Sequence, residues 1–210
     1  MTAPTLPLIV GLTGRAGSGK STASNWIIRN HHMVSPLAFA GPLKVMTYEL
    51  LRMALPKGHD PDARAYITDP VLKETPIPFL GNLTARRIMQ TLGTEWGREA
   101  LHQDFWIWLA AAKVERMIGS TFKKSDKVPL KIVFDDLRFA NEAAMIWAYG
   151  GLIIEIVRPD AEKPADIAGH ASEQLDFAAD VTIVNDGTVE DLEAKMAALL
   201  PVPPKPEKKA

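Results

Sequence analysis

The chain has 210 residues with a formal net charge of −1, and 47% of its residues are hydrophobic. This size fits one domain with a small lid or insertion, and the near-neutral charge excludes the overall basic field typical of proteins that bind nucleic acids or anionic membranes. Because cysteine is absent, disulfides and thiolate metal sites are excluded, in agreement with a reducing cytoplasm.

Five short apolar segments are predicted as strands, at 8–12, 33–39, 131–135, 152–157 and 181–184. Helices are predicted at 21–29, 42–55, 84–92, 104–118 and 137–149, and another is expected after Thr188. Strands that alternate with helices are typical of an α/β fold with a five-stranded parallel sheet flanked by helices. We therefore expect a single domain over 1–200, with a breaker-rich insertion or loop at 56–81 and a disordered tail at 201–210.

The stretch 14–21 follows the first predicted strand and reads Gly-Arg-Ala-Gly-Ser-Gly-Lys-Ser, the phosphate-binding pattern G-x-x-x-x-G-K-[ST]. Its glycines let consecutive backbone N–H groups turn toward phosphate oxygens, and the helix start that follows favours anions. Lys20 adds a positive charge for the β- and γ-phosphates, and the Ser21 hydroxyl can hold Mg²⁺. The pattern predicts a P-loop kinase core that binds ATP with Mg²⁺ at Gly14, Ala16, Gly17, Ser18, Gly19, Lys20, Ser21 and Thr22.

Two features follow along the chain before the middle of the sequence. Lys44 lies at the start of the helix predicted at 42–55, where it can reach phosphate or be a solvated lysine. The stretch 90–98 carries Gly93 and Gly97, which would let backbone approach a ligand, together with Thr94 and Arg98, which can contact a base or a phosphate. The alternative for this stretch is a helix C-cap glycine followed by solvated charges.

The strand predicted at 131–135 ends in two acidic residues, Asp135 and Asp136. Carboxylates at the carboxyl end of a parallel strand lie where open α/β sheets bind ligands, so one of them can orient Mg²⁺. Asp136 is alternatively the N-cap of the next helix. Arg138 is the cation expected near the reacting phosphates, and its alternative is an i,i+4 helical pair with Glu142.

The last part of the chain contains a candidate lid and a loop that is expected to lie near the base of the nucleotide. Arg158 follows a strand, and the polar stretch 159–169 can close over phosphates and exclude water. His170 is interpreted as a positioning residue or a surface histidine. Thr188 looks like a helix N-cap with Asp191 three residues on, and Asn185 and Gly187 just before it are expected to lie against an adenine ring.

The segments 39–44, 86–98, 136–142 and 170–173 resemble the deoxynucleoside monophosphate kinases of bacteriophages, and the resemblance runs from about residue 8 to residue 200. It implies a P-loop nucleoside monophosphate kinase that transfers the γ-phosphoryl group of ATP to a deoxynucleoside monophosphate. It assigns the acceptor to Lys44, Arg87, Gly93, Thr94, Gly97, Arg98 and Asp104. The expected catalytic residues are Lys20, Asp136, Arg138 and Arg158, and the expected metal contacts are Ser21 and Asp135.

Two other functions fit parts of the sequence. One is another small-molecule P-loop kinase such as dephospho-coenzyme A kinase, and the other is a nucleotide-binding switch protein. We expect small-molecule substrates, no nucleic-acid or membrane partner, and a cytoplasmic location, since residues 1–7 lack a signal-peptide pattern. The accepted bases and the oligomeric state, including a homodimer, are left open by the sequence.

Overall fold

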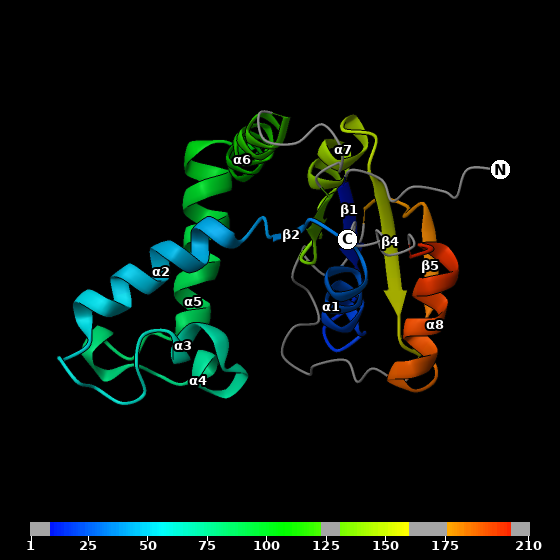
Figure 1. Ribbon diagram of the computed structural model, residues 1–210. Helices are drawn as coiled ribbons and strands as arrows, with labels where there is room; N and C mark the ends of the chain where they lie inside the picture. Colours follow the sequence, from blue (N-terminus) through cyan, green and yellow to red (C-terminus); the bar gives the residue numbers. More distant parts are fainter. Residues whose placement is uncertain (1–8, 123–130, 160–175, 203–210) are drawn as a thin grey trace, which may run out of the picture. The chain divides into compact units, whose positions relative to one another are not determined.

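The computed structural model describes residues 9–122, 131–159 and 176–202 of the chain (Figure 1). The chain divides into two compact units. The first unit consists of Met1–Ala38 and Ala111–Ala210, and the second is Phe39–Ala110. The second unit therefore contains the breaker-rich stretch 56–81 and extends beyond it on both sides.

The first unit is built on a parallel sheet of five strands. These strands are β1 (Ile9–Thr13), β2 (Val34–Leu37), β3 (Lys131–Phe134), β4 (Leu152–Val157) and β5 (Val181–Val184). They lie in the order β2-β3-β1-β4-β5, and every neighbouring pair is parallel. The predicted α/β class and the five-stranded parallel sheet are thus confirmed. Because β1 is central and Gly11 pairs with Phe134 and Ile153, the carboxyl ends of β1, β3 and β4 meet at one edge.

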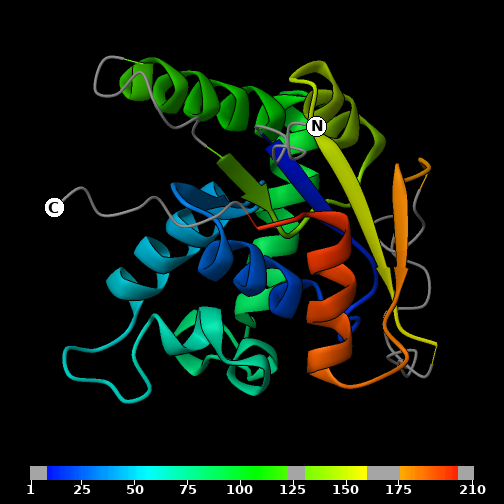
Figure 2. The ribbon, with the colours of Figure 1, turned by 45° about the vertical axis from the view of Figure 1, so that its right-hand side comes forward.

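Helices cover both faces of this sheet. On one face, α1 (Lys20–Asn30) and α8 (Val189–Leu199) contact each other and pack on Val10 and Leu12 of β1 (Figure 2). On the other face, α7 (Ala140–Ala148) packs so closely that a Cβ at Gly11 would lie 2.5 Å from Ile146. The side chains of β1 alternate between these two layers, as those of a buried strand must.

The second unit is helical. It contains α2 (Gly41–Ala54), α3 (Ala65–Thr68), α4 (Pro70–Glu74), the 3-10 turn η1 (Pro78–Leu80), α5 (Ala85–Gln90) and the π-helix η2 (Thr91–Leu101), and α6 (Phe105–Phe122) begins in it. Among the described helices, none has both the length and the apolar character needed to cross a membrane.

The stretch 56–81 is not a plain loop, because three short helical segments fill much of it. Two of its prolines stand at the first position of a helical segment, where a proline costs no hydrogen bond. The carboxylate of Asp69 accepts hydrogen bonds from the backbone N–H groups of Val71 and Leu72 and so caps α4. Tyr66, Ile67 and Ile77 from this stretch are buried with Leu51 of α2 in the core of the second unit.

His31 is a buried titratable group of the first unit. It directly follows α1, its side chain is 5% exposed, and its ring lies edge-on to Trp26 with the ring centres 5.6 Å apart. Burial lowers the pKa of His31, and the positive charges of Lys131 and His32 add to this, while the backbone of Leu200 opposes it. The folded protein therefore favours the neutral imidazole.

We predict that the free energy of unfolding falls as the pH drops below about 6.5, the ordinary pKa of histidine in an unfolded chain. In the window between that value and the lower pKa of folded His31, the unfolded chain binds the extra proton and is stabilised relative to the folded state. Denaturant titrations from pH 7.5 to 5 should show a shallower loss in His31→Asn. The His102→Asn variant, at an exposed position of the second unit, serves as the control, and equal slopes in the two variants would contradict the prediction.

Candidate functional site

The glycine loop between β1 and α1 has a backbone that side chains would not tolerate. Gly14, Gly17 and Gly19 have φ angles of 132°, 74° and 108°. A Cβ at Gly14 would lie 2.2 Å from the carbonyl oxygen of Ile156, and one at Gly19 would lie 2.6 Å from the Asn185 amide nitrogen. At Gly14 and Gly19, glycine is therefore required for steric reasons.

Lys20 is the first residue of α1, and its side chain reaches back over the loop. Its Nζ donates hydrogen bonds of 2.6 Å to the carbonyl oxygens of both Gly14 and Arg15. The ammonium group is thereby held above the loop instead of extending into solvent. A charge fixed in this place is suited to an anionic group that enters the loop.

A hollow of about 510 Å³ opens beside the loop, within the range of sites for small ligands. It joins the loop to the ends of β4 and β5 and to the start of α8. Its lining is Gly17, Ser18, Gly19, Lys20, Ser21, Thr22, Arg158, Asn185, Gly187, Thr188, Val189 and Leu192. The structure thus brings most of the expected ATP-binding residues together with Arg158. It adds Thr188, which the sequence indicated only as a helix N-cap, and Val189 and Leu192 of α8.

Asn185 forms a hydrogen bond with the glycine loop, a role that differs from the expected contact with adenine. Its side-chain amide donates to the carbonyl oxygen of Ser18 at 2.8 Å, and its backbone N–H donates to Val157 at 2.7 Å. The side chain is buried, so this hydrogen bond is shielded from water. The amide of Asn185 therefore fixes the position of the glycine loop relative to the end of β4.

The turn before α8 is held by a capping box, as the sequence predicts. Thr188 accepts from the backbone N–H of Asp191, and the Asp191 carboxylate accepts from the backbone N–H of Thr188 at 2.8 Å. The hydrogen bonds that the Asp191 carboxylate accepts from the backbone N–H and the hydroxyl of Thr188 lower the pKa of Asp191. Gly187 is needed here because a Cβ would lie 2.4 Å from that carboxylate.

The segment after β3 differs from expectation in where its helix begins. Helix α7 starts at Ala140 with Phe139 as N-cap, so the predicted start at 137 and the interpretation of Asp136 as N-cap are wrong. The carboxylate of Glu142, which is 3% exposed, caps the helix by accepting from the backbone N–H groups of Arg138 and Phe139 at 2.9 and 3.2 Å. Arg138 lies before the helix, so it does not form an i,i+4 pair on a helix face.

Thr13 links this segment to the glycine loop. It is the last residue of β1, it is fully buried, and its hydroxyl donates to the carbonyl oxygen of Leu137 at 2.9 Å. Leu137 stands between Asp136 and Arg138, so this single hydrogen bond ties both to the strand that carries the loop. Sequence reasoning missed Thr13, because a threonine at a strand end has no distinctive pattern.

The donor groups near the loop fit a magnesium ion that is bound chiefly through a nucleotide. Ser21 presents a hydroxyl in the hollow, and the half-buried Asp135 and Asp136 follow β3. In the described part of the chain, no group of three or more histidine or acidic residues could hold a metal ion by itself. Mg²⁺ commonly uses one or two protein carboxylates together with phosphates and water, so this sparse set suits it. The choice between Asp135 and Asp136 stays a prediction.

The stretch 91–101 is a π-helix that continues directly from α5. The sequence instead predicted that the helix ends at 92 and that a non-helical segment follows. The alternative of a C-cap glycine is also wrong, because Gly93 and Gly97 both lie inside η2. A Cβ at Gly97 would lie 2.5 Å from the Trp106 ring, and the Trp106 indole N–H donates to the Gly93 carbonyl at 2.8 Å. Packing thus accounts for Gly97, and contact of substrate with either glycine stays a prediction. Wide helical turns of this kind are frequent at functional sites.

Charged side chains gather around the start of this π-helix. The Glu95 carboxylate pairs with Arg87 at 3.2 Å and accepts from the Thr91 hydroxyl at 3.3 Å. Arg98 donates to the carbonyl oxygen of Gln103 at 3.4 Å, and the backbone N–H of Asp104 donates to His102. Glu95 was not among the expected site residues, although it stands between two that were.

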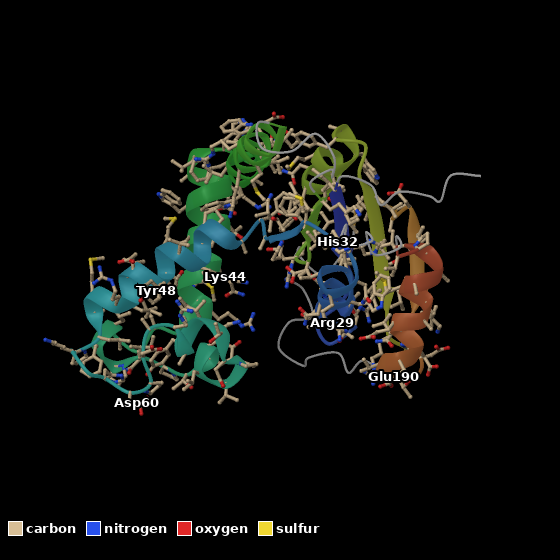
Figure 3. All side chains as sticks on the ribbon, viewed as in Figure 1. Arg29, His32, Lys44, Tyr48, Asp60 and Glu190 are labelled. Atoms are coloured by element: carbon tan, nitrogen blue, oxygen red, sulfur yellow. The ribbon has the colours of Figure 1, made fainter. Side chains whose placement is uncertain are left out.

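The residues expected to bind ATP and those expected to bind the acceptor lie in different units. Those assigned to ATP lie in the first unit, and those assigned to the acceptor lie in the second, namely Lys44, Arg87, Gly93, Thr94, Gly97, Arg98 and Asp104. Lys44 is an exposed residue of α2, labelled in Figure 3. His170, most of the expected lid at 159–169 and residues 203–210 of the expected tail lie outside the described residues.

Comparisons with known proteins point to one family. The family model described as "Deoxynucleotide monophosphate kinase" matches residues 64–196. A protein of Acanthamoeba polyphaga mimivirus, provisionally named a deoxynucleotide monophosphate kinase, is 27% identical over 205 residues, which are 90% of this chain and 94% of that protein. The deoxynucleotide monophosphate kinase of Escherichia phage RB69 is 30% identical over 115 residues, 55% of this chain and 44% of the phage protein.

Among solved structures, a protein of Thermus thermophilus is 18% identical, with a TM-score of 0.45. That alignment covers 93% of this chain and 97% of the other. This level of structural likeness supports no conclusion about the fold or the function of the chain.

We predict that Gly97→Ala lowers the free energy of unfolding by about 1–3 kcal/mol, because the added methyl group would overlap the Trp106 ring. Gly119→Ala is the matched control, since nothing lies within 4 Å of a Cβ at this helical glycine. Replacing that exposed glycine should be neutral or stabilising. Denaturant unfolding of the three proteins measures the difference, and equal stability of Gly97→Ala and wild type would refute the packing account.

Proposed function

Since the chain belongs to the deoxynucleotide monophosphate kinase family and is thus a phosphotransferase that acts on nucleotides, we propose that it transfers the γ-phosphoryl group of ATP to a deoxynucleoside monophosphate. The products are a deoxynucleoside diphosphate and ADP. One observation carries the proposal: a glycine loop with a lysine held over it opens into a hollow large enough for a nucleotide. The proposed setting is the cytoplasm.

The donor is proposed to bind in the hollow of the first unit. The backbone N–H groups of Gly17 and Gly19 and the N-terminus of α1 can surround the phosphates, and Lys20 neutralises their charge. The side of the hollow formed by Val189 and Leu192 is apolar and suits the flat face of an adenine ring. Asn185 acts in this scheme by holding the loop in place.

Transfer proceeds by in-line displacement. An oxygen of the acceptor monophosphate forms a bond to the γ-phosphorus while the bond to the β,γ-bridging oxygen breaks, and that oxygen leaves on ADP. The protein has little covalent chemistry to perform, so it contributes positioning and charge neutralisation. Lys20, Arg138 and Arg158 are proposed to share the negative charge of the migrating group. Asp136 is proposed to orient the Mg²⁺ ion that accompanies the phosphates.

Magnesium fits this scheme through the Ser21 hydroxyl and the carboxylate of Asp135 or Asp136. A bound ion would neutralise phosphate charge and orient the phosphate chain.

The acceptor is proposed to bind to the second unit, through the residues that the family resemblance assigns there. Arg87 and Arg98 offer planar guanidinium groups that match phosphate oxygens, and Asp104 can accept from a sugar hydroxyl or a base amine. Thr94, which is half-buried on η2, can donate to or accept from the base. These groups would set the choice of substrate.

The test is to incubate the protein with ATP and Mg²⁺ and with each deoxynucleoside monophosphate in turn, and to measure the diphosphate formed. We expect at least one deoxynucleoside monophosphate to be converted, with ADP produced in equal amount. Dephospho-coenzyme A in the same panel tests the rival kinase activity. Its phosphorylation without any deoxynucleotide product, or ATP turnover that needs no acceptor, would overturn the proposal.

Within this proposal, Lys20→Ala should lower the kcat for diphosphate formation by about 10³-fold, which corresponds to about 4 kcal/mol of transition-state stabilisation. Lys113→Ala, at an exposed position of α6, is the control and should leave the kcat unchanged. Thermal unfolding of both variants checks that the fold is kept. Turnover like that of wild type in a folded Lys20→Ala protein would refute the role of Lys20.

A further inference from the structure

Three basic side chains of the second unit lie on three neighbouring helices. They are Lys44 of α2, Lys73 of α4 and Arg86 of α5, and both α2 and α4 contact α5. Lys73 and Arg86 are half-buried, whereas Lys44, the one of the three that Figure 3 labels, is exposed. We refer to these three residues as the basic cluster. Only Lys44 of the three was among the residues expected to bind substrate.

The acidic groups beside Lys73 have other hydrogen-bond partners. Glu74 pairs with Arg86, and the Asp69 carboxylate accepts from the backbone N–H groups of Val71 and Leu72. Within residues 9–122, 131–159 and 176–202, the side-chain ammonium groups of Lys73 and Lys44 form no hydrogen bond and no ion pair, although the backbone N–H of each donates within its helix. A half-buried ammonium group without a counter-ion is unfavourable, because burial removes its hydration and nothing replaces it.

The electrostatics of the cluster agree with this shortage of negative charge. Burial lowers the pKa of Lys73, and the positive charges of Arg86 and Lys44 lower it further. Glu74 and Asp69 oppose the shift without cancelling it. An anion placed among the three side chains would remove the repulsion and supply the missing partner.

We propose that the basic cluster binds the phosphate group of the acceptor nucleotide and that Lys73 is a substrate-binding residue. Naming that anion as a deoxynucleoside monophosphate rests on the proposed function. The monophosphate carries close to two negative charges at neutral pH, a match for clustered cations. We thus assign to Arg86 the phosphate contact that the family resemblance gives to its neighbour Arg87, because Arg86 is half-buried and its partner Glu74 directly follows Lys73, whereas Arg87 is exposed.

The cluster gives the breaker-rich stretch 56–81 a chemical role. Helix α4 is short and packs on α3 and α5, and it is capped by Asp69 and paired with α5 through Glu74 and Arg86. The same ion pair joins α4 to α5 and sets Lys73 beside Arg86. Helix α4 can thus place Lys73 where it contacts a substrate that is bound beside α5.

The experiment compares Lys73→Met with Lys57→Met. Methionine keeps the apolar stem of the lysine and removes the charge, and Lys57 is an exposed lysine of the same stretch. For Lys73→Met we expect the KM for the deoxynucleoside monophosphate to rise about tenfold or more, with the KM for ATP and the kcat nearly unchanged. Lys57→Met should behave like wild type, and Lys73→Arg should recover most of the lost affinity.

Direct binding separates phosphate recognition from a merely structural effect. Calorimetry without ATP should show that Lys73→Met loses affinity for the deoxynucleoside monophosphate but binds the corresponding deoxynucleoside as wild type does. Inorganic phosphate is the second probe, and its binding should weaken in the same variant. Lys44→Met, at an exposed position, gives an independent test if Lys73→Met fails to fold, and its KM should rise in the same way.

Failure of this inference is distinct from failure of the proposed function. If wild type converts a deoxynucleoside monophosphate while Lys73→Met and Lys44→Met keep the wild-type KM, the cluster is not the phosphate site and the proposed function stands. If wild type converts none, the proposed function fails. The inorganic phosphate titration then decides whether the basic cluster is an anion site. Weaker phosphate binding in Lys73→Met than in Lys57→Met would support an anion site, and equal binding would overturn it.

Discussion

The backbone of the glycine loop is the constraint from which the rest of the first unit follows. Gly14 can take its φ of 132° without a clash only because it has no side chain to meet the Ile156 carbonyl. The loop is then held from three sides, by the Lys20 ammonium, by the Asn185 amide and by the pairing of β1 at the centre of the sheet. These contacts fix the shape of the loop and of the hollow beside it.

Local patterns predicted those parts of the fold that depend on local chemistry. Apolar, β-branched runs placed all the strands of the parallel sheet within a few residues, and the pair Thr188 and Asp191 placed the start of α8. The start of α7 was misplaced because its cap is Glu142, which acts from inside the helix on the backbone of Arg138. The π-helix could not be foreseen, since what shapes it is an indole ring from a later helix.

The same distinction applies to the candidate site. The loop and Lys20 are recognisable because their chemistry depends on spacing along the chain. The acceptor residues came from resemblance to a family, because an arginine on a helix has no pattern that separates substrate binding from solvation. Lys73 and Glu95 could not be found in the sequence, since their significance depends on which helices lie beside them. The stretch around Lys73 is dense in proline and glycine, which hid its helices.

The contact between Gly97 and Trp106 has a consequence for how the sequence can vary. The ring occupies the space that any side chain at position 97 would need, and its N–H is engaged by the Gly93 carbonyl. Neither residue can therefore be exchanged alone without loss. During divergence the two positions should change as a pair, with a larger residue at 97 accepted only after the indole has been replaced by a smaller group. Covariation between them would record this steric coupling across related chains.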